Sequence, residues 1–182
     1  LLEDVLRNSG GALPAKPAFD FTGSKNGRQA AIFPDVFDNF DTFLQVAQLL
    51  EDAGVRAYKG QVEFLAADNY LLETALRIHA TQARHAALVR TLRRQRGAQV
   101  KGWSSPSDAP LGATTVAARV YADEQTTVQR LPDLRPIPFR ESLPINVGTP
   151  PLSTDAILAK VAEAFDEPLD AASSEAIVQL FV

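Results

Sequence analysis

Two segments of the chain place apolar side chains at alternating intervals of three and four residues. One segment runs from Leu44 to Leu65 and the other from Leu71 to Leu92. This spacing holds one face of a helix toward its neighbours in a bundle, so we predict two long helices. The positions expected to face a core are Leu44, Gln48, Glu51, Val55, Tyr58, Val62 and Leu65 in the first helix, and Leu71, Ala75, Ile78, Gln82, His85, Val89 and Leu92 in the second.

Capping and breaking residues define the ends of these helices. The first helix follows Pro34-Asp35 and is expected to end near Leu65, and the second ends near Arg96, before Gly97. Because only about three residues separate them, the two helices should form an antiparallel hairpin. The candidate N-caps are Asp38 or Asp41 for the first helix and Asp68 or Asn69 for the second.

Two glycines lie inside the first predicted helix. Gly54 and Gly60 each cost about 1 kcal/mol relative to alanine at an interior helical position. Close approach of a neighbouring backbone, or a break near Gly60, would explain their presence.

Three polar residues in the predicted core faces need partners. The hairpin places Glu51 at the level of Gln82 and His85. An unpaired buried polar group costs about 1–3 kcal/mol, and a buried charge costs more. The partners of these side chains are one another, water or a metal, and the choice among them decides much of the function.

The rest of the chain is expected to consist of short helices and ordered loops. A helix over the first six residues stops at Gly10-Gly11, and a loop from about residue 11 to 33 is pinned by three phenylalanines. We divide the chain into a bundle portion (1–97), a proline-rich ordered wrap (98–151) and a C-terminal helical pair (152–182). The pinning residues are Phe19, Phe21 and Phe33.

Within the wrap and the C-terminal part, local signals predict three further helices. One spans about Ala113 to Gln125. The C-terminal pair meets at a turn containing Pro168. The caps and ends expected for that pair are Ser153 or Thr154 for a helix to about Phe165, and Asp170 for a helix that runs to the end of the chain.

Composition narrows the functional classes. The 182 residues are 46% hydrophobic, enough for a core, and carry a net charge of −4, which provides no electrostatic footprint for nucleic acid. The absence of cysteine excludes disulfides and thiolate chemistry. The sequence contains no run of about 18 apolar residues, which a membrane-spanning helix would need. The basic cluster Arg90, Arg93, Arg94 and Arg96 is interpreted as cations that favour a helix C-terminus.

Signatures of common active sites are absent from the sequence. It contains no glycine-rich phosphate loop, nucleophile elbow or dinucleotide fingerprint. Asp123-Glu124 has no basic or nucleophilic partner nearby in sequence, so we expect no catalytic pair there. The chain also has no methionine, and we expect a segment upstream of Leu1, where an export signal or lipid anchor would lie.

Two segments of the helical hairpin resemble bacterial ferritin-like domain proteins of the desiccation-related type. The segments are Leu50-Glu51-Asp52-Ala53-Gly54-Val55-Arg56-Ala57-Tyr58-Lys59-Gly60 and Ala83-Arg84-His85-Ala86-Ala87-Leu88-Val89-Arg90. Weaker matches are Pro17-Ala18-Phe19-Asp20-Phe21 and Phe165-Asp166-Glu167-Pro168-Leu169. The resemblance implies a mainly α fold, a ferritin-like antiparallel four-helix bundle whose first helices lie upstream or are incomplete.

The resemblance also implies a metal centre at which this sequence departs from the family. It carries over Glu51 as the glutamate of the third bundle helix and His85 as the histidine of the fourth. From their positions in the sequence, His79 and Tyr58 are candidates to surround this site; the favoured alternative is a hydrogen-bonded boundary histidine and a core tyrosine with a satisfied hydroxyl. The family pattern has glutamate where Gln82 stands, and a neutral amide does not bridge two metal ions. Glu51 and His85 therefore form either a surviving metal site or a hydrogen-bonded polar lock.

These considerations favour a non-catalytic structural, assembly or stress-related bundle with a degenerate di-metal site and no cofactor. The alternative is an iron- or manganese-binding oxidoreductase or storage protein that uses Glu51 and His85 with upstream carboxylates. A third hypothesis is a partner-binding module whose loop from Pro132 to Val147 lies along another chain. The expected partners are further copies or other protein chains, and the resemblance favours a location outside the cytoplasm, periplasmic or secreted.

Overall fold

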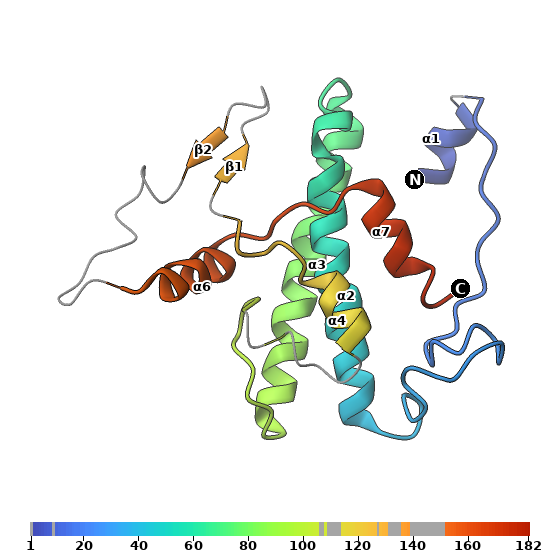
Figure 1. Cartoon of the computed structure of the whole chain (residues 1–182). Coiled ribbons are helices and arrows are strands. Elements are labelled where there is room, and N and C mark those ends of the chain that lie inside the picture. Colours follow the sequence, from blue (N-terminus) through green and yellow to red (C-terminus); the bar gives the residue numbers. More distant parts are fainter. Residues whose placement is uncertain are drawn as a thin grey trace.

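Two long helices dominate the computed structural model of the chain (Figure 1). The structure describes residues 2–8, 10–105, 108, 114–126, 128–130, 136–138 and 152–182. Helix α2 spans Phe40–Leu65 and α3 spans Asn69–Gln95. The shorter elements are α1 (Leu2–Asn8), α4 (Thr114–Val120), β1 (Val128–Arg130), β2 (Pro136–Pro138), α6 (Thr154–Ala164) and α7 (Ala171–Val178).

Helices α2 and α3 pack against each other as the predicted antiparallel pair. Asp68 is the N-cap of α3 and accepts hydrogen bonds from the amides of the next turn, as predicted. The N-cap of α2 is Asn39, not Asp38 or Asp41. The Asn39 side chain accepts from the Asp41 amide and donates to Asp35 at 2.8 Å, so Asp35 and Asn39 together fix the start of the helix.

The main apolar core lies on the side of α2 that faces α4 and α7. Leu49 is fully buried there, and Val46 and Ala53 flank it on the same face. This face was not recognised in the predicted stripes, which follow the side of α2 toward α3. The core also contains Phe33, Val36, Val116, Ala117, Val120, Leu169, Ile177 and Phe181.

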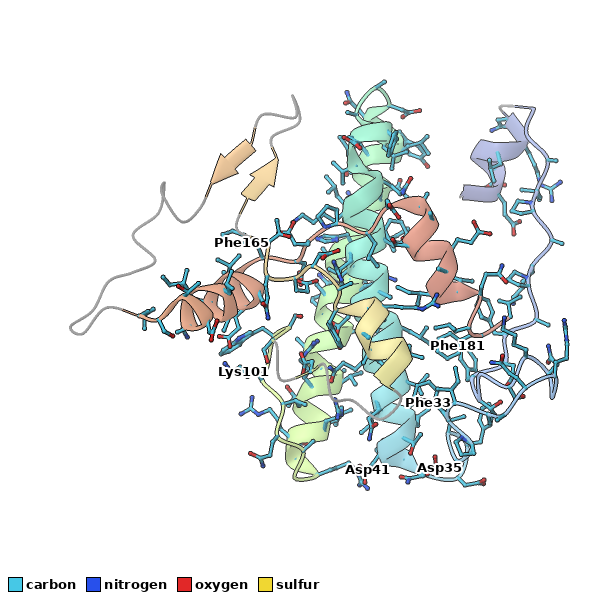
Figure 2. All side chains as sticks on the ribbon, in the orientation of Figure 1. Phe33, Asp35, Asp41, Lys101, Phe165 and Phe181 are labelled. Atoms are coloured by element: carbon cyan, nitrogen blue, oxygen red, sulfur yellow. The ribbon has the colours of Figure 1, made fainter. Side chains whose placement is uncertain are left out.

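One phenylalanine of the early loop ties it to the C-terminus. The rings of Phe33 and Phe181 stack with centroids 6.2 Å apart (Figure 2), and the Asp20 amide donates to the Phe181 carbonyl at 2.7 Å. The prediction that Phe33 pins the loop is confirmed. It is wrong for Phe19 and Phe21, which stack on each other and are 46% and 38% exposed.

The two C-terminal helices form at the predicted caps, Ser153 and Asp170, but lie on opposite sides of the long pair in Figure 1. Residues 166–169, which we call the C-terminal strap, cross α2 between them. The Leu169 amide donates to the Arg56 carbonyl at 3.1 Å. Consequently the strap is part of the packing of α2.

Part of the predicted wrap is regular structure. Helix α4 occupies the first half of the helix expected around residues 113–125. An antiparallel ribbon not predicted from the sequence pairs Val128 with Pro138 and Arg130 with Pro136. The loop from Pro132 to Val147 lies outside the described residues except at 136–138. No helix in the described ranges combines the length and apolar character that a membrane span needs.

Gly60 marks the closest approach between the strap and α2. A methyl group added at this position would lie 1.9 Å from the Leu169 carbonyl oxygen, so the predicted approach of a neighbouring backbone is confirmed. We expect Gly60→Ala to lower the free energy of unfolding by about 1–3 kcal/mol, because the strap must move. Urea denaturation measures this loss.

Gly102→Ala is the matched control, since the nearest atom to its added methyl group would be Arg94 Nη1 at 3.8 Å. It should change the free energy of unfolding by less than about 0.5 kcal/mol. Equal losses for Gly60→Ala and Gly102→Ala would contradict the close approach of the strap.

Candidate functional site

Glu51 and His85 lie against each other on the α2–α3 pair. His85 Nδ1 is 3.1 Å from Glu51 Oε1, and in the tautomer that carries a hydrogen on Nδ1 the histidine donates to the carboxylate. The prediction that the hairpin brings them to one height is confirmed. The prediction that His85 faces a core is wrong, because none of the described elements covers its side chain, which is 54% exposed against 27% for Glu51.

Gln82 packs onto α2 at Gly54. A Cβ at Gly54 would lie 2.1 Å from Gln82 Nε2, so the amide occupies the space that the glycine leaves open. Gln82 Oε1 is buried and has no hydrogen-bond partner in the described part of the chain. The lack of a side chain at Gly54 therefore makes room for a side chain of α3, whereas at Gly60 it makes room for the backbone of the strap.

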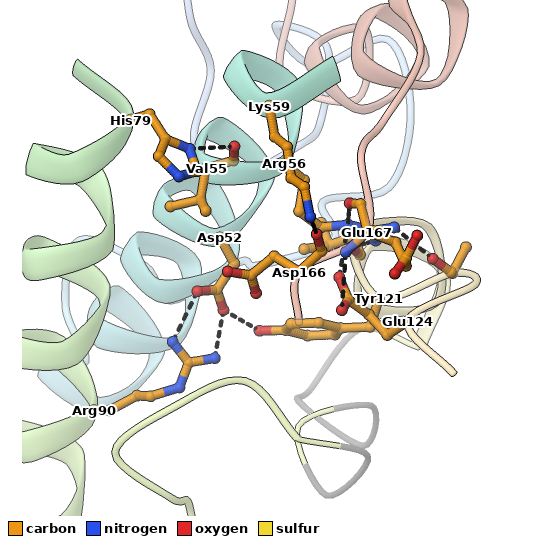
Figure 3. A network of polar contacts seen from close by, with 12 residues as sticks. Asp52, Val55, Arg56, Lys59, His79, Arg90, Tyr121, Glu124, Asp166 and Glu167 are labelled. Atoms are coloured by element: carbon orange, nitrogen blue, oxygen red, sulfur yellow. Dashed lines mark hydrogen bonds and ion pairs between the residues drawn. The ribbon is translucent and has the colours of Figure 1, made fainter. Parts of the chain in front are cut away.

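His79 and Tyr58, predicted to surround the site, occupy different places. His79 Nδ1 lies 2.9 Å from the carbonyl oxygen of Val55 (Figure 3), which is one helical turn along α2 from Glu51. Tyr58 is half-buried on α2, two helical turns from Glu51. The structure therefore brings together only Glu51 and His85 of the predicted site residues.

These residues alone do not fit a di-metal centre. Such a centre in a bundle uses a glutamate from each of two helices and a Glu-x-x-His pair from each of two others. Within the described ranges no group of three or more histidine, cysteine, aspartate and glutamate side chains is arranged to hold a metal ion. Gln82 supplies an amide where the pattern requires a carboxylate, and that amide packs on Gly54.

A second polar cluster is buried between α2 and α3. Its residue on α2 is Asp52, which directly follows Glu51. Arg90 donates to both carboxylate oxygens of Asp52 at 2.7 Å and to Asp108 at 2.9 Å. The Tyr121 hydroxyl donates to Asp52 Oδ2 at 2.6 Å (Figure 3). These four side chains link α2, α3 and the segments that precede and follow α4. We call them the Arg90 cluster.

Gln48 joins the Arg90 cluster to a second arginine. Gln48 Nε2 donates to the Tyr121 hydroxyl at 3.1 Å, and Gln48 Oε1 accepts from Arg93 at 2.6 Å. Gln48 was predicted as a polar residue in a core-facing position, and it is fully buried. Its amide is therefore satisfied on both sides, as a buried polar group requires.

Burial and the neighbouring charges set the protonation states of the Arg90 cluster. Burial opposes the charge of Arg90, but the hydrogen bonds and attraction of Asp52 outweigh it and raise the pKa of the guanidinium. Burial, together with the charge of Asp52, raises the pKa of the Tyr121 phenol. Near neutral pH the cluster therefore holds a charged guanidinium at Arg90 and a neutral phenol at Tyr121.

A third cluster surrounds Arg56, on the face of α2 toward α4 and the C-terminal strap. Arg56 Nε lies 2.6 Å from the Glu167 carbonyl oxygen and 2.7 Å from Glu124 Oε1. Its terminal nitrogens donate to the carbonyl oxygens of Val120 and Ala122. A single buried guanidinium thus holds the end of α4, the following turn and the strap to α2.

These arginine clusters were not predicted from the sequence. The interpretation of Arg90 and Arg93 as cations at a helix C-terminus is wrong, because both side chains are buried among polar partners. Glu124 does have a basic partner, Arg56, which is 68 residues away along the chain. The sequence did contain a signal for a second buried face on α2. Asp52 and Arg56 are four residues apart, so they share a face, and the apolar residues Val46, Leu49 and Ala53 lie beside it.

The family comparison agrees with the helical hairpin. The ferritin-like domain family matches residues 1–95, more than half of the 182-residue chain. The chain belongs to the ferritin-like domain family. Comparisons with curated proteins and with solved structures gave no match.

Proposed function

We propose that the chain is a non-catalytic ferritin-like module, in which the metal-binding position has become a polar contact that fixes the register of two helices. The contact between Glu51 and His85 carries this proposal. His85 Nδ1 and Glu51 Oε1 are engaged with each other, and the third position of the family pattern holds an amide packed on Gly54. Polar residues buried in bundles are known to fix helix register, and a second helical pair that covered this side would bury Glu51 and His85.

We assign the module an assembly role through the side of α3 that no described element covers. Leu88, one helical turn from His85, is 58% exposed there. A second helical pair placed on this side would complete a four-helix bundle and enclose Glu51 and His85. The resemblance to desiccation-related proteins supports a stress-related role outside the cytoplasm.

The competing function is metal binding with carboxylates from that second helical pair. The exposure of His85 favours it, because a ligand supplied by another helix can reach the imidazole without displacing a described residue. Iron and manganese suit a site of carboxylates and imidazole. In that case Glu51 and His85 would be ligands, and their mutual contact would open on metal binding.

Metal content decides between the two functions. We expect full-length protein purified without chelator to contain no transition metal above the buffer level, measured by inductively coupled plasma mass spectrometry. One or two ions per chain in the wild type, lost in Glu51→Gln, would overturn the proposal and establish the competing function.

The Gln82→Glu variant tests whether Gln82 is the residue that prevents metal binding. If it gains metal, Gln82 is the residue that disables metal binding in the wild type. Gln95→Glu, an exposed change on the same helix, adds the same charge elsewhere and should gain none. Metal gained equally by both variants would indicate adventitious binding to added carboxylates.

A further inference from the structure

The C-terminal strap is attached to α2 through charged side chains in addition to its backbone contacts. Lys59 Nζ donates to the Asp166 carbonyl, and Arg56 Nε donates to that of Glu167. The Glu167 amide lies 3.4 Å from Glu124 Oε2. The carboxyl group of Glu124 therefore bridges Arg56 on α2 and the backbone of the strap.

Carboxyl groups outnumber cations around this bridge. Glu124 and Glu167 are both buried, at 6% and 8% exposure, and Glu167 Oε1 has no hydrogen-bond partner among the described residues. If Glu124, Glu167 and Asp166 were all ionised, their three negative charges would exceed the two positive charges of Arg56 and Lys59, and excess charge in a buried place is costly. Arg56 from α2 and Asp166 and Glu167 from the strap act on the charge of Glu124, and Lys59 from α2 acts on that of Glu167. Tyr121 and Asp123, from the turn that holds Glu124, line the same cavity.

We propose that Glu124, Glu167 and Arg56 form a proton-operated latch: with one proton bound by the two carboxyl groups the strap is closed on α2, and loss of that proton loosens it. The latch has one moving part, residues 166–169, which carry no helix or strand. Its fixed part is Arg56, which remains bound to the carbonyl oxygens of Val120 and Ala122.

The electrostatics of the two carboxyl groups support the latch. Burial raises the pKa of Glu124 to about 7, and Asp166 and Glu167 add to this shift against the opposing attraction of Arg56. Burial also raises the pKa of Glu167. A cavity of about 460 Å³ is lined by Glu124, Tyr121 and Thr126, so water reaches the carboxyl group and can exchange its proton.

The direction of the pH effect follows from the raised pKa. The closed state binds the proton more tightly than the open state, where Glu124 returns toward its ordinary pKa of 4.5. The closed strap is therefore most favoured below about pH 4.5, and this preference is lost as the pH rises to about 7. Between these values the opening constant should rise by up to about tenfold per pH unit and then level off.

Hydrogen exchange of the Leu169 amide measures the opening, because this amide is bonded to the Arg56 carbonyl. We would record it by NMR from pH 5 to 8.5, corrected for the intrinsic pH dependence of exchange. The wild type should show the rise and plateau. The Glu124→Gln variant, which keeps the shape of the side chain but does not titrate, should give a shallower profile, because only Glu167 can then take up the proton.

Two further variants make the test specific. Glu175→Gln on α7 removes an acidic group that does not face Glu124, and it should keep the wild-type profile. Glu167→Gln removes a charge that raises the pKa of Glu124, so its plateau should begin at lower pH, and it replaces Glu124→Gln if that variant does not fold. A flat wild-type profile, or an unchanged slope in Glu124→Gln, would overturn the latch.

Discussion

Replacing Arg90 with methionine is expected to lower the free energy of unfolding by about 3–5 kcal/mol. The guanidinium is 2% exposed and is the ion-pair partner of both Asp52 and Asp108. Removing it leaves two buried carboxylates without a compensating charge, which costs far more than the lost contact itself. Urea denaturation followed by circular dichroism measures the change.

Two comparisons isolate the buried charge as the cause. Arg94→Met, an exposed arginine four residues further along α3, should change stability by less than about 0.5 kcal/mol. Adding Asp52→Asn and Asp108→Asn to Arg90→Met should restore part of the loss, because the amides carry no charge. Similar losses for Arg90→Met and Arg94→Met would show that the Arg90 cluster does not stabilise the fold.

Replacing Arg56 with methionine should destabilise the chain to a similar extent, by about 3–5 kcal/mol. Its guanidinium is 2% exposed, is paired with Glu124, and also donates to three carbonyl oxygens. Without it, Glu124 loses its counter-charge and the end of α4 loses two donors. Arg84→Met, an exposed change on α3, is the control and should be nearly neutral.

A double-mutant cycle tests whether Arg56 acts through Glu124. In a Glu124→Gln background, Arg56→Met should cost less by about 1 kcal/mol or more, because no carboxylate is left unpaired. Strictly additive losses in the cycle would mean that Arg56 stabilises the fold only through its carbonyl contacts.

Local sequence signals were sufficient for the helices and their order, although not for the β1–β2 ribbon. Asp68, Ser153 and Asp170 cap the helices for which they were proposed, because a short polar side chain just before an apolar series satisfies the first free amides. The antiparallel arrangement followed from the short turn between α2 and α3. The contact between Glu51 and His85 was then predicted because the two residues lie at similar distances along the chain from that turn.

The clusters around Arg90 and Arg56 could not be predicted in the same way. Their partners lie far apart in the chain, such as Arg56 with Glu124, and depend on how segments without helical periodicity cross α2. Charged residues near a helix end are also usually solvated, so the sequence favoured exposure for Arg90. Only the packing of α4 and the strap shows that α2 is buried on more than one side.

The separation of the Glu51–His85 pair from the apolar core has an evolutionary consequence. Leu49 and its neighbours stabilise α2 from one side, while Glu51 and Gln82 belong to another. Substitutions at Glu51 or Gln82 alter what the polar face can bind and leave Leu49 and its neighbours intact. The polar face of this helical hairpin can therefore change in sequence over time while the apolar packing that holds α2 in place stays the same.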